Sequence, residues 1–183
     1  IQCTELVSKT GIDSIWIPET WGMENFSMLG AVANKTKTQK IGSSIINIYS
    51  RSPSTIAMGS ATTDTLSNGR LILGLGTSSV PIVEDFHGEK FENPVQRMRE
   101  YVEIIRLSLM KKQINYSGKI FDLKNFTLLI EPKRQSIPIY LAAINQKMVN
   151  LCWEIADGVI FYLRPLDEMK KTISKMQSQK NID

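Results

Sequence analysis

The sequence has 183 residues, of which 42% are hydrophobic and 22% are charged, and its formal net charge is +4 at pH 7. This composition is that of a globular chain with a buried core, and it excludes wholesale disorder. There is no basic stripe with interleaved aromatic residues and no apolar stretch of ~20 residues, so we expect neither a nucleic-acid partner nor a membrane partner.

Short apolar runs alternate with helical patterns along the whole chain. Residues 2–9 read as the end of a helix, which stops at Thr10-Gly11. The runs that follow are predicted strands at residues 14–17, 41–47, 71–76, 137–143 and 159–163. Helices are predicted at residues 25–35, after the capped starts Ser52-Pro53 and Asn93-Pro94, over residues 148–155 and from Pro165. This alternation is typical of an α/β fold in which helical crossovers join parallel strands.

Residues 113–130 interrupt the alternation. Two short β patterns flank Ser117-Gly118-Lys119, which predicts a hairpin inserted into the repeat. No Pro/Gly-rich linker or low-complexity segment divides the chain, so residues 1–183 are predicted to form a single domain. The chain begins with Ile rather than Met, inside a helical pattern, and we therefore expect the native protein to be longer.

The two cysteines, Cys3 and Cys152, lie far apart and lack the spacing of a metal site. We expect two buried, reduced thiols, which fits a cytoplasmic protein, and no metal centre.

The carboxyl ends of parallel strands meet on one face of the sheet, where the chemistry of such folds is found. Mostly neutral hydrogen-bonding groups gather there: Glu19, Thr20, Ser44, Asn47, Thr77, Ser78, Asn145 and Arg164. This set favours a cradle for a cofactor over a hydrolase triad. Glu19 is the candidate catalytic residue, because a carboxylate at a strand end can position a substrate or act as acid or base. The alternative is a solvated carboxylate at the rim.

Ser43 and Ser44 place two hydroxyls inside a strand that should be buried on both faces, which is costly unless they are hydrogen-bonded. Either a bulge redirects them or a ligand takes their hydrogen bonds. Asn145 and Gln146 begin a helix directly after a strand, so free backbone N–H groups can bind an anion there. Ordinary capping by Asn145 is the alternative, and it is compatible with an anion site.

Two further signals are weaker. Gly74-Leu75-Gly76 resembles the start of a dinucleotide fingerprint, but Ser79 occupies the third glycine position. We favour two glycines that thin the strand where another backbone or a ligand approaches closely. His87 is the only histidine, and a single loop histidine is more often a surface or structural residue than a catalytic one.

Several stretches of the sequence, taken together, resemble the luciferase-like flavin- or deazaflavin-dependent oxidoreductases, in particular members of the methylenetetrahydromethanopterin reductase type. The matching stretches are GIDSIWIPE, IGSSIINIYSRSP, TDTLSNGRLILGLG, DFHGEKF with RMREYVEIIR, PIYLAA and ADGVI. They run over nearly the whole chain in family order. The resemblance implies a TIM (β/α)8 barrel, here an incomplete one that covers about strands two to six, with the hairpin inserted after strand four.

The resemblance also implies an oxidoreductase that binds FMN or coenzyme F420 and carries out hydride transfer or flavin-dependent monooxygenation of a small organic substrate. It implies a non-prolyl cis peptide at Ser44–Ile45 that backs the flavin-type ring. The implied cofactor-binding residues are Ser44, Ile45, Asn47, Gly76, Thr77, Ala143, Asn145 and Gln146, with the phosphate-bearing tail near the last two. A homodimer is common in the family.

Three positions depart from the family pattern. Ser52 stands where many members have His, and Thr77 stands where flavin-using members often have a basic residue. Residues 144–146 replace small glycine-containing turns. FMN and coenzyme F420 therefore both remain open. The alternatives to an enzyme of this kind are a non-catalytic flavin-binding barrel and an NAD-binding domain, of which the broken glycine pattern disfavours the second.

Overall fold

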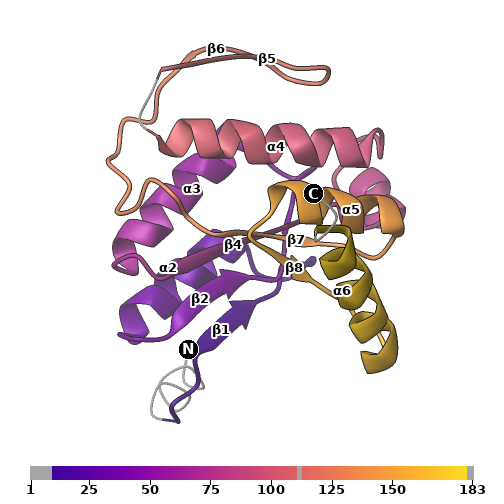
Figure 1. The fold of residues 1–183 in the computed structure, drawn as a ribbon. Helices are drawn as coiled ribbons and strands as arrows, with labels where there is room; N and C mark the ends of the chain where they lie inside the picture. The colour runs from indigo at the N-terminus through magenta and orange to yellow at the C-terminus, as the bar shows by residue number, and fades with distance from the viewer. Residues whose placement is uncertain (1–9, 111–112, 181–183) are drawn as a thin grey trace.

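The computed structural model describes residues 10–110 and 113–180, so the helix expected at residues 2–9 lies outside the described residues. Its centre is a parallel sheet with the strand order β1, β2, β4, β7, β8, and a short β3 pairs with β4 (Figure 1). The strands are β1 (Ser14–Ile17), β2 (Lys40–Ser43), β3 (Ile46–Asn47), β4 (Leu71–Gly76), β7 (Ile139–Ala142) and β8 (Gly158–Ile160). The predicted alternation of parallel strands and helices is thereby confirmed.

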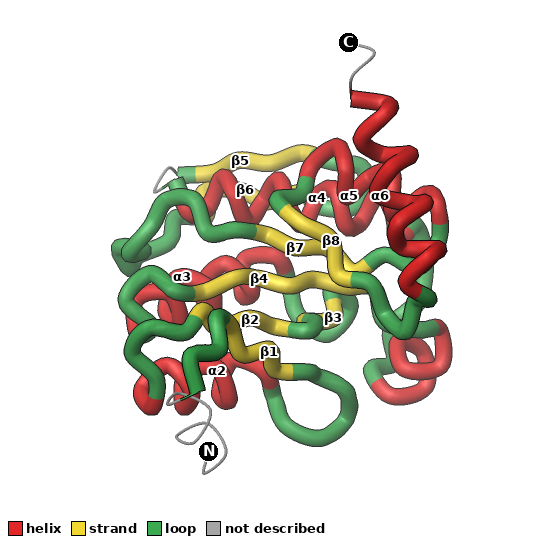
Figure 2. The backbone as a smooth tube through the Cα atoms, turned by 60° about the horizontal axis from the view of Figure 1, so that its bottom comes forward, coloured by secondary structure: helices red, strands yellow, loops and turns green. Residues whose placement is uncertain are grey.

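The helices are α2 (Asn25–Lys35), α3 (Pro53–Leu66), α4 (Pro94–Leu109), α5 (Gln146–Ile155) and α6 (Leu166–Lys180). Helices α2, α3, α4 and α5 each pack on the next, so they cover the same face of the sheet. Figure 2 shows the strands in one layer, from β1 to β8. This arrangement is that of an incomplete α/β barrel, as the sequence predicts.

Strand β4 lies in the middle of the sheet, and all six of its residues are buried. Its leucines belong to the hydrophobic core, whereas its glycines lie on the alternate face. A Cβ on Gly74 would overlap the backbone oxygen of Ser43, and one on Gly76 would meet the side chain of Ile45. The glycines therefore allow close approach of the preceding strand, as expected, and do not form a dinucleotide-binding loop.

The predicted strand at residues 41–47 is divided into β2 and β3, and the peptide bond between Ser44 and Ile45 is cis, as expected. The hydroxyl of Ser43 donates to the carbonyl oxygen of Gly74 at 2.8 Å and accepts from the amide of Gly74 at 2.7 Å. The Ser43 side chain thus takes the place of a backbone partner in the ladder, which explains how a buried strand tolerates it.

Several element boundaries differ from the predictions. Strand β7 begins at Ile139 because Pro138 has no N–H to give to the ladder. Strand β8 ends before Leu163, whose φ of 43° is left-handed and incompatible with an extended strand. Asn93 also has a left-handed φ and makes no side-chain cap hydrogen bond, so its predicted capping role is wrong. Ser52 does cap α3, since its hydroxyl accepts from an amide of the first turn.

The predicted hairpin is present as β5 (Ile114–Ser117) and β6 (Asp122–Phe126), which lie beyond α4 at the top of Figure 1. Glu100 of α4 is fully buried beneath the turn of this hairpin. Its carboxylate accepts hydrogen bonds of 2.8–3.1 Å from three turn amides, those of Lys119, Ile120 and Phe121. Burial acts to raise the pKa of Glu100, but the hydrogen bonds from Gln96 and these amides outweigh it and hold the pKa below its usual value.

We expect Ser43→Ala to lower the free energy of unfolding by about 1–3 kcal/mol, because it leaves both backbone groups of Gly74 buried without a partner. Denaturant unfolding measures the change. Ser60→Ala is the control: its hydroxyl is also buried but donates only to Ile56 of its own helix, so the loss should be clearly smaller. Equal losses in the two variants would contradict the proposed role of Ser43.

We expect Glu100→Gln to lower stability by about 1.5–3 kcal/mol at pH 7, because the amide-to-carboxylate hydrogen bonds are charge-assisted. The pKa of Glu100 is lowered in the folded state, so its contribution is full above the unfolded pKa of about 4.3 and is lost as the pH falls through the folded pKa. Unfolding curves of both proteins between pH 7 and pH 3 should therefore converge on the acid side. Glu168→Gln is the control, because this residue is exposed on α6, and its stability should not differ from that of the unaltered protein in this pH-dependent way. If the stability loss in Glu100→Gln were the same at every pH, the charged carboxylate of Glu100 would not be its source.

Candidate functional site

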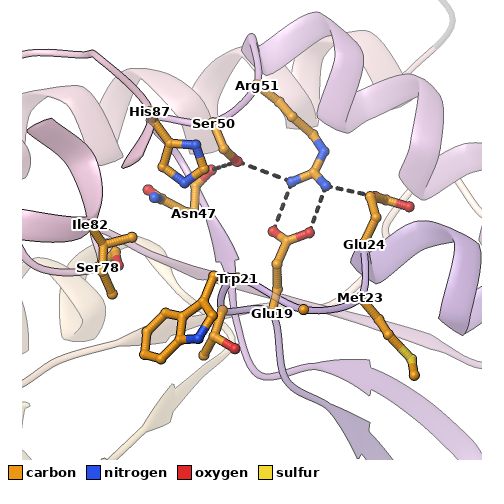
Figure 3. A pocket seen from close by; sticks show the side chains of 12 residues that line it. Glu19, Trp21, Met23, Glu24, Asn47, Ser50, Arg51, Ser78, Ile82 and His87 are labelled. Atoms are coloured by element: carbon orange, nitrogen blue, oxygen red, sulfur yellow. Dashed lines mark hydrogen bonds and ion pairs between the residues drawn. The ribbon is translucent and has the colours of Figure 1, made fainter. Parts of the chain in front are cut away.

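A cleft of about 290 Å³ opens at the carboxyl ends of β1, β3 and β4 (Figure 3). Its lining residues come from the segments that follow these strands: Glu19, Thr20, Trp21, Gly22, Met23 and Glu24 after β1, Asn47, Ser50 and Arg51 from β3 onward, and Ser78, Ile82 and His87 after β4. Because the strands are parallel, these segments meet at one edge of the sheet. This is the face on which the sequence predicts the chemistry.

Arg51 is the centre of an ion cluster in this cleft. Its two terminal nitrogens contact the carboxylate of Glu19 at 2.8 and 2.6 Å, and Nη2 also contacts Glu24 at 2.6 Å. The side chains of Arg51 and Glu19 are only 15% and 10% exposed. Hydrogen bonding to Glu19 raises the pKa of Arg51 against the opposing effect of burial, so the guanidinium stays charged.

The cluster holds both ends of the segment from Glu19 to Glu24. Glu24 caps α2 by accepting from the amides of Phe26 and Ser27, at 3.0 and 2.7 Å. Burial acts to raise the pKa of Glu24, but its hydrogen bonds with Ser27 and Phe26 and the charge of Arg51 lower it overall. The hydroxyl of Tyr101, from α4, donates to the backbone oxygen of Arg51 at 2.6 Å. The segment from Glu19 to Glu24 is therefore linked to α2 directly and to α4 through Arg51.

Glu19, the predicted catalytic residue, lies in the cleft but is not a solvated carboxylate at the rim. Both of its oxygens accept from Arg51, and one also accepts from the amide of Asn25 at 2.9 Å. It would have to leave a bidentate ion pair before taking up a proton. The geometry thus favours a positioning role over proton transfer, and a catalytic role for Glu19 stays a prediction.

An aromatic contact closes one side of the cleft. Trp21 is 72% exposed, and its ring meets that of Phe86 edge to face, with a centroid distance of 5.7 Å and an interplanar angle of 87°. Phe86 ends a π-helix, η1 (Ile82–Phe86), where the sequence predicts only a loop. The contact joins the segment after β1 to the segment after β4. The sequence of neither segment predicts this contact.

Asn47 is the predicted cofactor-binding residue that lines the cleft. It is 5% exposed, and its Oδ1 accepts from the amide of Tyr49 at 2.9 Å. Its Nδ2 is buried and has no hydrogen-bond partner among the described residues. A buried donor without a partner costs about 1–3 kcal/mol. A ligand that presents an acceptor to Nδ2 would remove this cost.

The other predicted cofactor-binding residues do not line this cleft: Ser44, Ile45, Gly76, Thr77, Ala143, Asn145 and Gln146. Gly76 lies beside Asn47 as its register partner in the sheet, and Ile45 lies against Gly76. The side chain of Asn145 caps α5 by accepting from the amide of Met148 at 3.0 Å, which confirms the capping alternative. Anion binding at Asn145 and Gln146 stays a prediction.

Sequence reasoning missed the importance of Arg51 and the position of His87. Arg51 comes four residues after Asn47, close enough to the strand end to have marked it as a candidate. The sequence favours a surface or structural position for His87; the side chain is exposed, as the surface interpretation expects, and it also lines the cleft. It comes ten residues after the predicted strand-end residue Thr77, and only the path of the intervening π-helix brings it back to the cleft.

The described residues offer few other groups that could bind a metal or react. Within residues 10–110 and 113–180, no three His, Cys, Asp or Glu side chains gather as metal ligands. Cys152 is buried, and burial raises the pKa of its thiol to about 12, whereas Cys3 lies outside the described residues. No helix in the described part of the chain is long and apolar enough to cross a bilayer.

Comparison with known proteins gives a consistent picture. The profile of the luciferase-like monooxygenase family matches residues 1–181. A 5,10-methylenetetrahydromethanopterin reductase of Archaeoglobus fulgidus is 38% identical over 157 residues, which are 85% of this chain and 46% of the relative. A putative coenzyme F420-dependent oxidoreductase of Mycobacterium tuberculosis is 34% identical over 166 residues, covering 83% of this chain and 48% of that protein.

Among solved structures, a coenzyme F420-dependent tetrahydromethanopterin reductase of Methanopyrus kandleri is similar, with a TM-score of 0.78 and 26% identity over 86% of this chain and 49% of that one. An F420-dependent secondary alcohol dehydrogenase shares the fold, with a TM-score of 0.85 and 22% identity over 97% of this chain and 58% of that one. The chain thus spans about half the length of the relatives that it matches.

We expect Arg51→Ala to lower the free energy of unfolding by about 3 kcal/mol, because it leaves the shielded carboxylate of Glu19 without its partner. Arg99→Ala is the matched control. Arg99 also forms a two-pronged ion pair, with Glu154 at 2.7 and 2.6 Å, but the side chains are 30% and 60% exposed. An exposed pair of this kind is screened by solvent and contributes little to stability, so denaturant unfolding should separate the two variants. Similar losses would show that the Arg51 cluster is no more than a surface ion pair.

Proposed function

The chain belongs to the luciferase-like monooxygenase family, and from that premise we propose that the protein is an oxidoreductase that binds coenzyme F420 or FMN. Its proposed reaction is hydride transfer or flavin-dependent monooxygenation of a small organic substrate. The observation that carries the proposal is the orphaned Nδ2 of Asn47 in the wall of the strand-end cleft. A ring system with carbonyl and nitrogen acceptors offers that donor a partner.

The residues present fit such a group. Gly76 lies beside Asn47 in the sheet, and the space that a Cβ would take there is filled by the side chain of Ile45, with Ala142 next to it. Ser44, Ile45 and Gly76 are proposed to back the ring, and Asn145 and Gln146 to receive the phosphate-bearing tail through the first amides of α5. The bound cofactor supplies the two-electron chemistry, while the chain orients it and excludes water.

Coenzyme F420 is the first candidate and FMN the second. The relatives from Archaeoglobus fulgidus and Mycobacterium tuberculosis are named as a methylenetetrahydromethanopterin reductase and a putative F420-dependent oxidoreductase. Thr77 stands where flavin-using members often carry a basic residue. Hydride transfer from or to F420 is therefore the favoured form of the reaction.

The alternative from another class is a barrel that binds a flavin without turnover. Substrate-dependent bleaching of the cofactor absorbance separates the two, because a passive binder leaves the spectrum unchanged. A homodimer, the absence of a nucleic-acid partner and a cytoplasmic location also belong to the proposal. A buried thiol at Cys152 agrees with the last of these.

We expect Asn47→Asp to weaken binding of coenzyme F420 or FMN at least about fivefold, the equivalent of one hydrogen bond of about 1 kcal/mol. The substitution keeps the acceptor for the amide of Tyr49 but removes the donor Nδ2. Cofactor fluorescence titration gives the Kd. Asn34→Asp is the control, because the amide of Asn34 lies exposed on α2 and donates to Gly30 of its own helix. If neither cofactor binds the unaltered protein, the proposed function is wrong; if Asn47→Asp binds normally, only the assignment of Asn47 is wrong.

A further inference from the structure

We propose that His87, rather than Glu19, is the residue that exchanges a proton with the substrate in the cleft. The inference rests on the proposed function and names a residue of the same site. The sequence favours a surface or structural role for this histidine, and the position of its side chain in the cleft wall is what points to chemistry (Figure 3).

Four ionisable side chains line the cleft. These are Glu19, Glu24, Arg51 and His87. The first three are bound to one another, since Arg51 contacts both carboxylates at 2.6 Å. A guanidinium does not release its proton in a protein, and each carboxylate would have to give up hydrogen bonds from the guanidinium and from backbone amides before it could take up a proton. None of these three groups is free to carry a proton to a substrate and take it back.

His87 takes no part in this ion cluster. It follows η1 directly, and its imidazole is exposed and makes no hydrogen bond with any of the described residues. Histidine is the side chain that ordinarily changes charge between pH 5 and pH 8, which suits it to give and take a proton near neutrality. In Figure 3 its ring lies on the same side of the cleft as Ser50 and Asn47, across from Trp21 and Glu19. A substrate between these walls can therefore reach the imidazole while Asn47 binds the cofactor.

The proposed proton transfer accompanies the transfer of a hydride to the substrate. A reduced deazaflavin or flavin gives a hydride to an electrophilic carbon that is bonded to nitrogen or oxygen. As the C–H bond forms, one carbon–heteroatom bond or π bond breaks and its electron pair stays on the heteroatom. The heteroatom takes a proton from the imidazolium of His87, which recovers one from water, while the remaining proton of the reduced cofactor goes to solvent. The substrate gains two hydrogens and the cofactor loses two.

Other charges surround this imidazole. Across the cleft lie Glu19, Glu24 and Arg51, which bind one another, and its own chain segment carries Glu84, Asp85 and Glu89. The carboxylate of Glu84 is bound to the amide of Phe91 at 3.2 Å.

The test compares His87→Gln with Asp85→Asn, a neighbour on η1 that does not line the cleft. The probes are reduced coenzyme F420 and 5,10-methylenetetrahydromethanopterin, with reduced FMN as a second arm. We expect His87→Gln to lower kcat about 10²-fold or more and to remove one limb of the pH profile of kcat, with the cofactor Kd within about twofold of the unaltered protein. Asp85→Asn should keep the rate and both limbs.

A second measurement does not depend on turnover. His87 is the only histidine of the 183-residue sequence, so its imidazole proton resonance can be assigned by its loss in His87→Gln. Oxidised F420 together with the probe substrate should shift this resonance and slow the reaction of the ring with diethyl pyrocarbonate. An unshifted resonance with unslowed modification, or a normal kcat and pH profile in His87→Gln, would overturn the role of His87. Failure of F420 and FMN to bind the unaltered protein would instead overturn the proposed function.

Discussion

The shielded ion cluster of Arg51 with Glu19 and Glu24 is the interaction on which the shape of the cleft depends. One guanidinium binds the carboxylates at both ends of the segment after β1, while its own backbone is held by Tyr101 of α4. That segment carries Trp21, whose ring reaches Phe86 after β4. A buried pair of this kind contributes to stability mainly because either partner alone would be an uncompensated charge. Because separating Arg51 from Glu19 would leave such a charge, the pair also holds the segment after β1, which forms one wall of the cleft, in place.

The ion cluster also determines which residues of the cleft can contact a ligand. Once Glu19 and Glu24 are bound to Arg51, the groups that can still meet a ligand include the neutral Asn47 and the exposed His87. Asn47 offers a donor from a buried and rigid position at the end of β3, whereas His87 stands on the segment after η1. A binding group on a strand and a proton carrier on a loop are a common arrangement in barrel sites, because the strands position and the loops adapt.

The close contact of β2 with β4 supports this edge of the sheet. Gly74 lets the backbone of Ser43 approach, and the Ser43 hydroxyl then satisfies both backbone groups of Gly74. The next turn of the chain places Asn47 beside Gly76. The serine that looked too polar for a buried strand is thus part of the ladder, and the glycines that resembled a nucleotide-binding motif are its counterpart.

The sequence by itself determined the parallel α/β architecture and the hairpin, because apolar runs of strand length, helical periodicity, glycine and proline report local and repeated preferences of the backbone. It also placed Glu19 and Asn47 at strand ends, since a strand boundary can be read along the chain. Only the tertiary structure decided which partners these residues have. The pairing of Glu19 with Arg51, the orphaned donor of Asn47 and the return of His87 to the cleft each depend on segments that are far apart in sequence, and no local pattern encodes which distant side chain will satisfy a given charge or hydrogen bond.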